Sequence, residues 1–256
     1  MALPHAHVPF NRIAEYQDII RKERLNLEIY FGSAVLDAIS PVDIERLSAL
    51  LDYRPSLSFH APFMDLSPGA VDSKVRRATT ERFFHVLDIA EVLRPKVIVF
   101  HSGYEKWKYA LNVGLWLEKS LETWRPVSAR ASGMGVKIAI ENIFEDEPSS
   151  LKLLMTEMAS EDFGVCFDTG HCHLFSKAPL DQWMQALNPH ILELHLHDND
   201  GTADLHLPMG DGTFDFDTFF RLLERKDCVY TLEAHSPEHF RKSMAYLSAR
   251  GIVRGS

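Results

Sequence analysis

Residues 195–206 concentrate side chains that can bind metal ions. The segment reads HLHDNDGTADLH and holds three histidines and three aspartates within twelve residues. Imidazole nitrogens and carboxylate oxygens together bind divalent cations without any cysteine. A solvated polar loop has a similar composition, so this segment alone is compatible with a metal site and with a plain surface loop.

Side chains of the same kind follow five other apolar segments of the chain. One polar residue at such a place carries little information, because strands commonly end in polar loops. Six successive segments that end this way are hard to explain by chance, provided that the fold brings their ends together. The residues are His60, His101, Glu141, Asp168 with His171, His195 with Asp204 and His206, and Glu233.

The segments that carry these residues have the patterns of strands, and helical patterns separate them. We expect Asn11 to cap the first helix and Pro126 to break or kink the fourth. The predicted strands cover residues 3–10, 25–31, 56–60, 96–100, 136–140, 163–167, 191–197 and 229–232. The predicted helices cover residues 11–20, 41–51, 71–93, 107–132, 151–158, 180–187, 214–225 and 237–250.

Eight strand–helix units in 256 residues predict an α/β fold, a closed parallel (β/α)₈ TIM barrel that forms a single domain over residues 1–256. A doubly wound open sheet is the competing fold, but no G-x-G-x-x-G follows the first predicted strand. In a barrel the carboxyl ends of all strands meet on one face. The carboxylates of Glu141, Asp168 and Glu233 would repel one another there unless a cation or protons lay between them. The sequence therefore predicts a divalent-metal site.

The composition narrows the classes of partner. A net charge of −9 argues against a general nucleic-acid or anionic-membrane surface, although a local basic groove stays possible. Three widely spaced cysteines suit a reducing cytosol better than a disulfide framework. The N-terminus has no signal-peptide pattern, and no run approaches about 18 apolar residues. We therefore expect a cytoplasmic protein with no membrane partner.

Several segments resemble motifs of the superfamily that contains endonuclease IV and the xylose-isomerase-like sugar-phosphate isomerases and epimerases. The resemblance extends from about residue 60 to the end of the chain, whereas the first 55 residues carry no diagnostic motif. The motifs are FHAPFMDLSPG (59–69), FHSG (100–103), AIENIF (139–144), FDTGHCHLF (167–175), HLHDNDGTADLHLPMGDG (195–212) and TLEAH (231–235).

Resemblance to the isomerase and epimerase branch implies one Mn²⁺-, Co²⁺- or Mg²⁺-type ion held by two glutamates, an aspartate and a histidine. By position these residues are Glu141, Asp168, His195 and Glu233. The two glutamates would lie on opposite sides of the sugar and move protons beside its carbonyl, which the metal polarises.

Resemblance to endonuclease IV implies instead three Zn²⁺ ions, which activate a water and neutralise a phosphodiester. All nine matching ligands are present: His60, His101, Glu141, Asp168, His171, His195, Asp204, His206 and Glu233. We expect Zn²⁺ or Mn²⁺, with one to three ions, and we expect Glu141, Glu233 and His171 to be catalytic.

The surroundings of these residues favour a small sugar-like substrate over DNA. An enzyme that acts on DNA holds phosphates with lysine and arginine. Residues 32–40, where endonuclease IV carries a basic loop, have no basic residue, and residues 145–147 form an acidic lip. Against the epimerase reading, the arginine that this branch often carries after His195 is missing. Three functions remain possible from the sequence: an isomerase or epimerase, a phosphoester hydrolase, and a non-catalytic metal-binding barrel. The sequence does not identify the substrate, the metal or the oligomeric state.

Other residues have plainer expected roles. We expect all four tryptophans to be core or helix-packing residues. For His5 and His7 we expect exposure near the terminus, and a place in the pocket lining is the alternative. His197 either orients a metal ligand or has a structural role. Phe63 either packs beside a sugar ring or stacks on a base, and the former is favoured.

Overall fold

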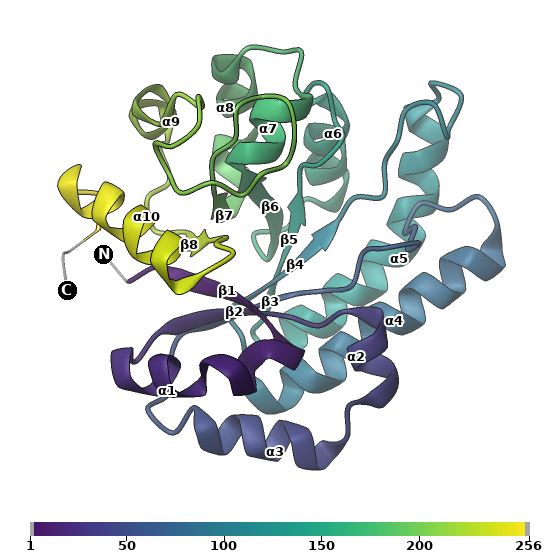
Figure 1. The fold of residues 1–256 in the computed structure, drawn as a ribbon. Coiled ribbons are helices and arrows are strands. Elements are labelled where there is room, and N and C mark those ends of the chain that lie inside the picture. The colour runs from purple at the N-terminus through teal and green to yellow at the C-terminus, as the bar shows by residue number, and fades with distance from the viewer. Residues whose placement is uncertain (1–2, 254–256) are drawn as a thin grey trace.

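The computed structural model describes residues 3–253 and forms a closed barrel of eight parallel strands (Figure 1). Each strand pairs with the next along the chain, and the eighth pairs with the first. The predicted (β/α)₈ barrel is confirmed. The strands are β1 (His5–Pro9), β2 (Asn26–Tyr30), β3 (Leu57–His60), β4 (Val97–His101), β5 (Lys137–Glu141), β6 (Phe163–Asp168), β7 (Ile191–Leu196) and β8 (Val229–Leu232).

Helices surround the barrel on the outside (Figure 1). Within residues 3–253, every helix falls short of the length or the hydropathy that a membrane span requires. The α-helices are α1 (Ile13–Glu23), α2 (Ser33–Ala38), α3 (Pro41–Leu50), α4 (Ser73–Leu93), α5 (Val113–Gly133), α6 (Ser149–Met158), α7 (Thr169–Phe175), α8 (Leu180–Leu187), α9 (Phe216–Leu222) and α10 (Pro237–Ala249). Two 3₁₀ turns, η1 (Phe10–Arg12) and η2 (Asn188–His190), complete the set.

The strands direct alternate side chains into the barrel and towards the helices, as their two-residue period requires. In β4, Ile98 and Phe100 join the core between strands and helices. Val97 and Val99 share the opposite face with His101 and pack in a second, smaller apolar cluster. The inward face of a strand thus carries an apolar floor and, at its carboxyl end, a polar residue.

Two helices differ from the sequence prediction at their N-termini. The chain forms η1 after β1, so Asn11 does not cap α1, which begins at Ile13 without a side-chain cap. The helix predicted from residue 107 begins only at Val113, where the Asn112 side chain accepts a hydrogen bond from the Leu115 backbone N–H. Both predictions were wrong because tight turns precede these helices and delay their start.

The altered start of α5 leaves Trp107 outside the core. Its side chain is 76% exposed, whereas the other three tryptophans are fully buried, so the core prediction fails for Trp107 alone. Pro126 lies inside α5 without ending it. Trp124 and Val127 beside it are completely buried, and their packing holds the helix together despite the missing backbone donor. Helices α2 and α7 were not predicted, because each is a short segment directly after a strand.

Gly164 in β6 gives a direct test of barrel packing. A Cβ atom there would lie 2.2 Å from the His190 carbonyl oxygen and 2.6 Å from Leu192 Cγ. We expect Gly164→Ala to lower the free energy of unfolding by about 1–3 kcal/mol, measured by urea denaturation. Gly133→Ala is the control, because its Cβ would meet nothing within 4 Å. Equal destabilisation by both substitutions would contradict the close packing at Gly164.

Candidate metal centre

The carboxyl ends of strands β3 to β8 bring all nine expected ligands to one rim of the barrel. Four of the nine are the last residues of β3 to β6, and one lies near the end of β7. One follows β8 directly, one lies in α7, and two lie in the loop after β7. In this order they are His60, His101, Glu141, Asp168, His195, Glu233, His171, Asp204 and His206.

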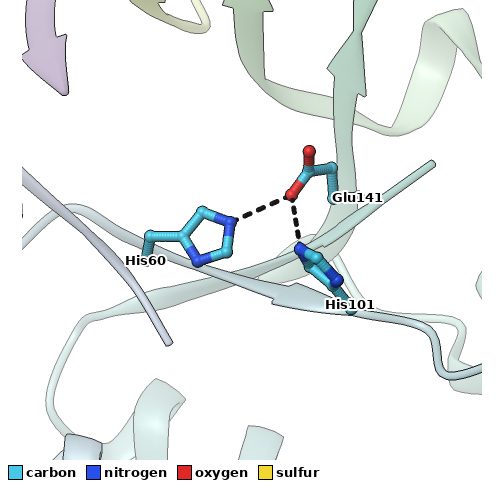
Figure 2. A group of neighbouring side chains, drawn as sticks. All are labelled: His60, His101 and Glu141. Carbon is cyan, nitrogen blue, oxygen red and sulfur yellow. Dashed lines mark hydrogen bonds and ion pairs between the residues drawn. The ribbon is translucent and has the colours of Figure 1, made fainter. Parts of the chain in front are cut away.

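Glu141 joins two histidines into a first group of candidate ligands. One oxygen, Oε2, lies 3.1 Å from His60 Nε2 and 3.2 Å from His101 Nε2 (Figure 2). His60 Nδ1 lies 2.8 Å from the Ala61 carbonyl oxygen, which can only accept a hydrogen bond. Nδ1 therefore carries a proton and donates it to this carbonyl, an arrangement that fixes the ring while Nε2 faces the centre. Phe63 stacks on His101 with ring centroids 4.2 Å apart.

Asp168 holds a second group through His171 and His197. Both Asp168 oxygens lie 3.1 Å from His197 Nε2, and His171 Nδ1 lies 3.5 Å from one of them. The Asn142 side chain fixes the backbone of Asp168 with two hydrogen bonds. The His197 ring fills the place of a side chain at Gly170, where a Cβ atom would lie 2.0 Å from ring atom Cε1.

Glu233 holds a third group, which shares His197 with the second. Its Oε2 lies 3.3 Å from His206 Nδ1 and 3.7 Å from His197 Nε2. The other His206 nitrogen lies 3.1 Å from Asp204 Oδ2. The rings of His197 and His206 stack with centroids 4.0 Å apart. His206 has a φ of 46°, a left-handed conformation uncommon outside glycine, so local contacts hold this ligand in a strained backbone.

His195 lies between the two glutamates. Its Nδ1 is 3.4 Å from Glu141 Oε1 and 3.3 Å from Glu233 Oε1, yet it makes no hydrogen bond to either. His197, whose role the sequence left open, is fully buried among Asp168, Glu233 and His206. The structure therefore adds His197 to the candidate ligands. The H-x-H spacing, which puts both imidazoles on one strand face, was the signal for it.

Glu28 in β2 is a functional candidate that the sequence reasoning missed. It is fully buried, with Oε2 2.9 Å from His195 Nε2 and Oε1 2.7 Å from His7 Nδ1. The signal was a single acidic residue amid the alternating apolar residues of strand 25–31. His5 and His7 are not exposed as expected: His5 is buried against Ser58, and His7 is mostly buried against Glu28. Closure of the barrel through β1 and β8 turns both inward.

Glu193 lies below Glu28 in the barrel, and the two carboxyl groups differ in protonation: Glu193 is neutral and Glu28 is ionised. Burial and the charge of Glu28 raise the pKa of Glu193 to about 8, so it is a neutral acid at pH 7. It accepts hydrogen bonds from Ser58 Oγ at 2.8 Å and Thr231 Oγ1 at 2.5 Å. Burial alone would raise the pKa of Glu28 too, but His195 and His7 hold it well below its usual range. Glu28 is therefore the charged member of the pair.

Imidazoles alone balance the carboxylates of the centre. Within residues 3–253, no lysine or arginine forms an ion pair with Glu141, Asp168 or Glu233. Burial alone would raise the pKa of Glu233, but the surrounding histidines, His195 foremost, lower it to about 2. Burial likewise opposes ionisation of Glu141, and the histidines around it, again His195 foremost, hold its pKa well below its usual range.

The donor set fits a divalent cation. Among residues 3–253, the Nδ1 atoms of His195 and His197 are buried without any hydrogen-bond partner, an arrangement that is rare in folded proteins. Both lie amid carboxylates with no basic side chain to neutralise them. Nitrogen and oxygen donors converging in this way suit Zn²⁺ and Mn²⁺. The residues that would hold a cation are the nine expected ligands and His197.

The acidic lip expected at residues 145–147 is only partly present. Glu145 is buried and accepts hydrogen bonds from Ser102 Oγ and the Ile143 backbone N–H, and burial raises its pKa. Asp146 pairs with Lys106 and Lys177. The lip prediction was wrong for these two residues, because neighbouring loops supply donors that the local sequence did not reveal.

A cavity of about 1020 Å³ opens above the candidate ligands. His60, His101, Glu141, His206 and Glu233 form its polar floor. Aromatic side chains form part of its wall: Tyr30, Phe63, Tyr104, Phe144 and Phe175. A small molecule inside would contact the candidate ligands and an aromatic surface together.

Metal binding should release protons. Burial lowers the pKa of His206, but Asp204 and Glu233 raise it to about 9, so the ring is protonated at pH 7. A metal ligand must be neutral, so affinity for Zn²⁺ or Mn²⁺ should rise with pH up to about 9. Calorimetric titration in buffers of different ionisation enthalpy should detect at least one proton released per ion at pH 7. A binding heat independent of the buffer would contradict this.

Glu28 should determine metal affinity through His195. We expect Glu28→Gln to weaken divalent-metal binding by about 10–100-fold, because the charge that orients and polarises the imidazole is lost. Glu193→Gln is the matched control: it replaces a neutral acid by a neutral amide and should leave the affinity nearly unchanged. Calorimetry gives the affinities, and circular dichroism checks the fold. Equal weakening by both substitutions would rule out this role for Glu28.

Comparisons with known proteins agree with the geometry. The model of the family described as "Xylose isomerase-like TIM barrel" matches residues 27–250, beginning well before the first recognisable motif. The uncharacterized protein MJ1311 of Methanocaldococcus jannaschii is 31% identical over 186 residues, which cover 70% of this chain and 64% of that relative. The chain thus spans just under two thirds of the length of this relative.

Solved structures extend the comparison. The TTHB071 protein of Thermus thermophilus, soaked with ZnCl₂, is 27% identical with a TM-score of 0.82, covering 98% of this chain and 99% of that one. A D-tagatose 3-epimerase-like protein is 26% identical with a TM-score of 0.80 and 96% coverage of both chains. Endonuclease IV from Thermus thermophilus, at 19% identity and a TM-score of 0.68, covers 96% of this chain and all of its own, and shares the fold. This chain belongs to the xylose isomerase-like TIM barrel family.

Proposed function

We propose that this protein is a divalent-metal-dependent isomerase or epimerase of a small sugar-like substrate, in which Glu141 and Glu233 transfer protons beside a carbonyl. The observation that carries this proposal is the pair of buried, ionised carboxylates on either side of His195 Nδ1. They come from β5 and β8, three strands apart around the barrel, and both line the cavity. A substrate between them would present opposite faces to the two carboxylates.

Both carboxylates are ionised at pH 7 and can therefore accept a proton. The histidines around Glu141 and Glu233 keep both ionised, and burial excludes water that would compete for the proton. His171 Nδ1, 3.0 Å from Glu141 Oε1, orients the first carboxylate. His7 Nδ1, 3.4 Å from Glu233 Oε1, orients the second. A divalent cation held by the candidate ligands would polarise the carbonyl and hydroxyl oxygens of the substrate.

The cavity wall suits a sugar better than a nucleic acid. Aromatic faces such as Phe63 and Tyr30 pack against the apolar faces of sugar rings. Of the described residues that line the cavity, Arg12 and Lys108 are its only lysine or arginine side chains. Arg12 is paired with Glu15, and Lys108 donates to Ser67 Oγ. Two such cations are few for a phosphodiester backbone.

Two similar structures support the proposal. One is the D-tagatose 3-epimerase-like protein, and the other is the TTHB071 protein soaked with ZnCl₂. Phosphoester hydrolysis is the alternative function, and the observation in its favour is the convergence of all nine ligands that endonuclease IV would require. One bound ion per chain would favour isomerisation, and two or three would favour hydrolysis.

Isotope exchange tests the proposal. In deuterium oxide, the Mn²⁺- or Zn²⁺-loaded protein should introduce deuterium beside the carbonyl of at least one ketose in a broad panel, detected by NMR. Glu233→Gln should slow exchange by about 10²–10⁴-fold, because it removes a general base. Glu147→Gln, in the loop after β5 and outside the cavity, should leave exchange unchanged.

The hydrolase alternative is assayed with the same protein. Lack of exchange over the whole panel, combined with metal-dependent cleavage of an abasic-site DNA duplex, would replace isomerisation by hydrolysis. Lack of both activities, combined with strong stabilisation by metal, would indicate a non-catalytic binding barrel.

A further inference from the structure

The cavity above the candidate metal centre continues into an apolar arm between α1 and α10. We define this arm by Ile19, Ile20 and Leu25 on one side and by Leu232, Pro237 and Phe240 on the other. Figure 1 shows β1 passing between α10 and α1. Ala6 and Val8 of β1, which alternate with the inward-facing His5 and His7, also line the cavity, so it extends to the outer face of this strand.

The arm and the centre form one cavity, although they lie on opposite faces of the barrel wall. Leu232 lines the arm, while the next residue, Glu233, lies at the centre. Adjacent residues of a strand face opposite sides, so the cavity must pass over the carboxyl edge of β1 and β8. Pro9, the last residue of β1, and Ala234, two residues after β8, lie at this edge and line the cavity.

The two ends of the cavity differ in chemistry. At the centre stand ionised carboxylates and imidazoles, whereas the arm presents aliphatic side chains and the Phe240 ring, with Arg12, Tyr16 and Glu23 of α1 also lining the cavity. The Glu23–Arg241 ion pair, with 2.8 Å between its charged atoms, joins α1 to α10 beside the arm. A ligand that fills the whole cavity therefore needs a polar end and an apolar end.

The size of the cavity also points to a composite ligand. Pockets for drug-sized ligands have volumes of about 300–1,000 Å³, and this cavity of about 1020 Å³ lies at the upper limit. A single sugar ring at the centre is far smaller than such a ligand and would leave the arm empty. Ile20 and Leu232 are already buried, whereas Ile19, Leu25, Pro237 and Phe240 keep part of their surface exposed. Apolar surface in contact with water is unfavourable, so an apolar group attached to the sugar would gain affinity by covering these four side chains.

We propose that the arm binds an alkyl or aryl substituent of the substrate, so that the substrate is a glycoside-like molecule with an apolar part and a polar sugar part that carries its carbonyl on a ring carbon other than the anomeric one. This inference rests on the proposed function for the sugar part only. Continuity of the arm with the centre is the reason for assigning both to one ligand. A second copy of the chain seated in the arm is the competing occupant.

Matched ligands test the arm directly. Methyl and phenyl glycosides of the same panel of sugars differ only in the apolar substituent, and calorimetry with the Mn²⁺-loaded protein measures both affinities. At least one phenyl glycoside should bind about 10-fold or more tightly than its methyl counterpart. Ile19→Trp fills the arm and should abolish this preference without weakening the methyl ligand. Gln17→Trp, on the exposed face of α1, is the matched control and should keep the preference.

A second variant covers the case in which Ile19→Trp does not fold. Phe240→Ala removes one wall of the arm and should reduce the preference for phenyl over methyl glycosides. Equal affinities of the two ligands throughout the panel would overturn the proposal, as would concentration-dependent self-association that Ile19→Trp abolishes. Deuterium exchange into ketoses is measured separately, so the arm can be refuted while the isomerase function stands, and the reverse.

Discussion

The structure depends on one electrostatic constraint: three buried carboxylates share a rim where none of the described residues 3–253 supplies a lysine or arginine to neutralise them. Glu141, Asp168 and Glu233 are at most 8% exposed, and among residues 3–253 each forms ion pairs with imidazoles only. Like charges held this close in a poorly polarisable interior are strongly unfavourable unless positive charge lies between them. Histidine differs from lysine here because it can lose its proton near neutral pH. A bound cation can then neutralise the carboxylates in place of the imidazolium charge. Imidazoles therefore provide the charge balance of these carboxylates and are at the same time candidate metal ligands.

The interior of the barrel is divided into an apolar part and a polar part, and the polar part supports the buried carboxylates. The inward faces of β4 and β5 carry an apolar floor of Val97, Val99 and Ala139 beneath the polar rim. On the other side, Glu28 and Glu193 continue the polar network downward, one ionised and one protonated. An ionised carboxylate at position 193 would be repelled by the charge of Glu28. Because Glu193 is protonated, both side chains can remain buried. Support for His195 thus comes from below, through residues that never contact solvent.

The sequence predicted the fold and the convergence of the nine candidate ligands because both depend on simple periodicity. Parallel strands end on one face, so a ligand-type residue at each strand end must reach the same rim. Glu28, His5 and His7 escaped prediction because their roles depend on closure between β1 and β8, a contact between the two ends of the chain. Trp107 and the residues of the acidic lip were misjudged for a similar reason. Their surroundings are formed by neighbouring loops, whose positions no local pattern encodes.

Gly170 and His197 illustrate how far such a non-local contact constrains the chain. The imidazole of His197 occupies the volume that any side chain at residue 170 would need. Neither position can change alone: a larger residue at 170 expels the ring, and the loss of the ring leaves a void against the glycine. Homologous barrels should therefore covary at these two positions, with glycine wherever the second histidine of H-x-H is present. Homologues that lack both the glycine and the second histidine would have a centre with fewer candidate ligands.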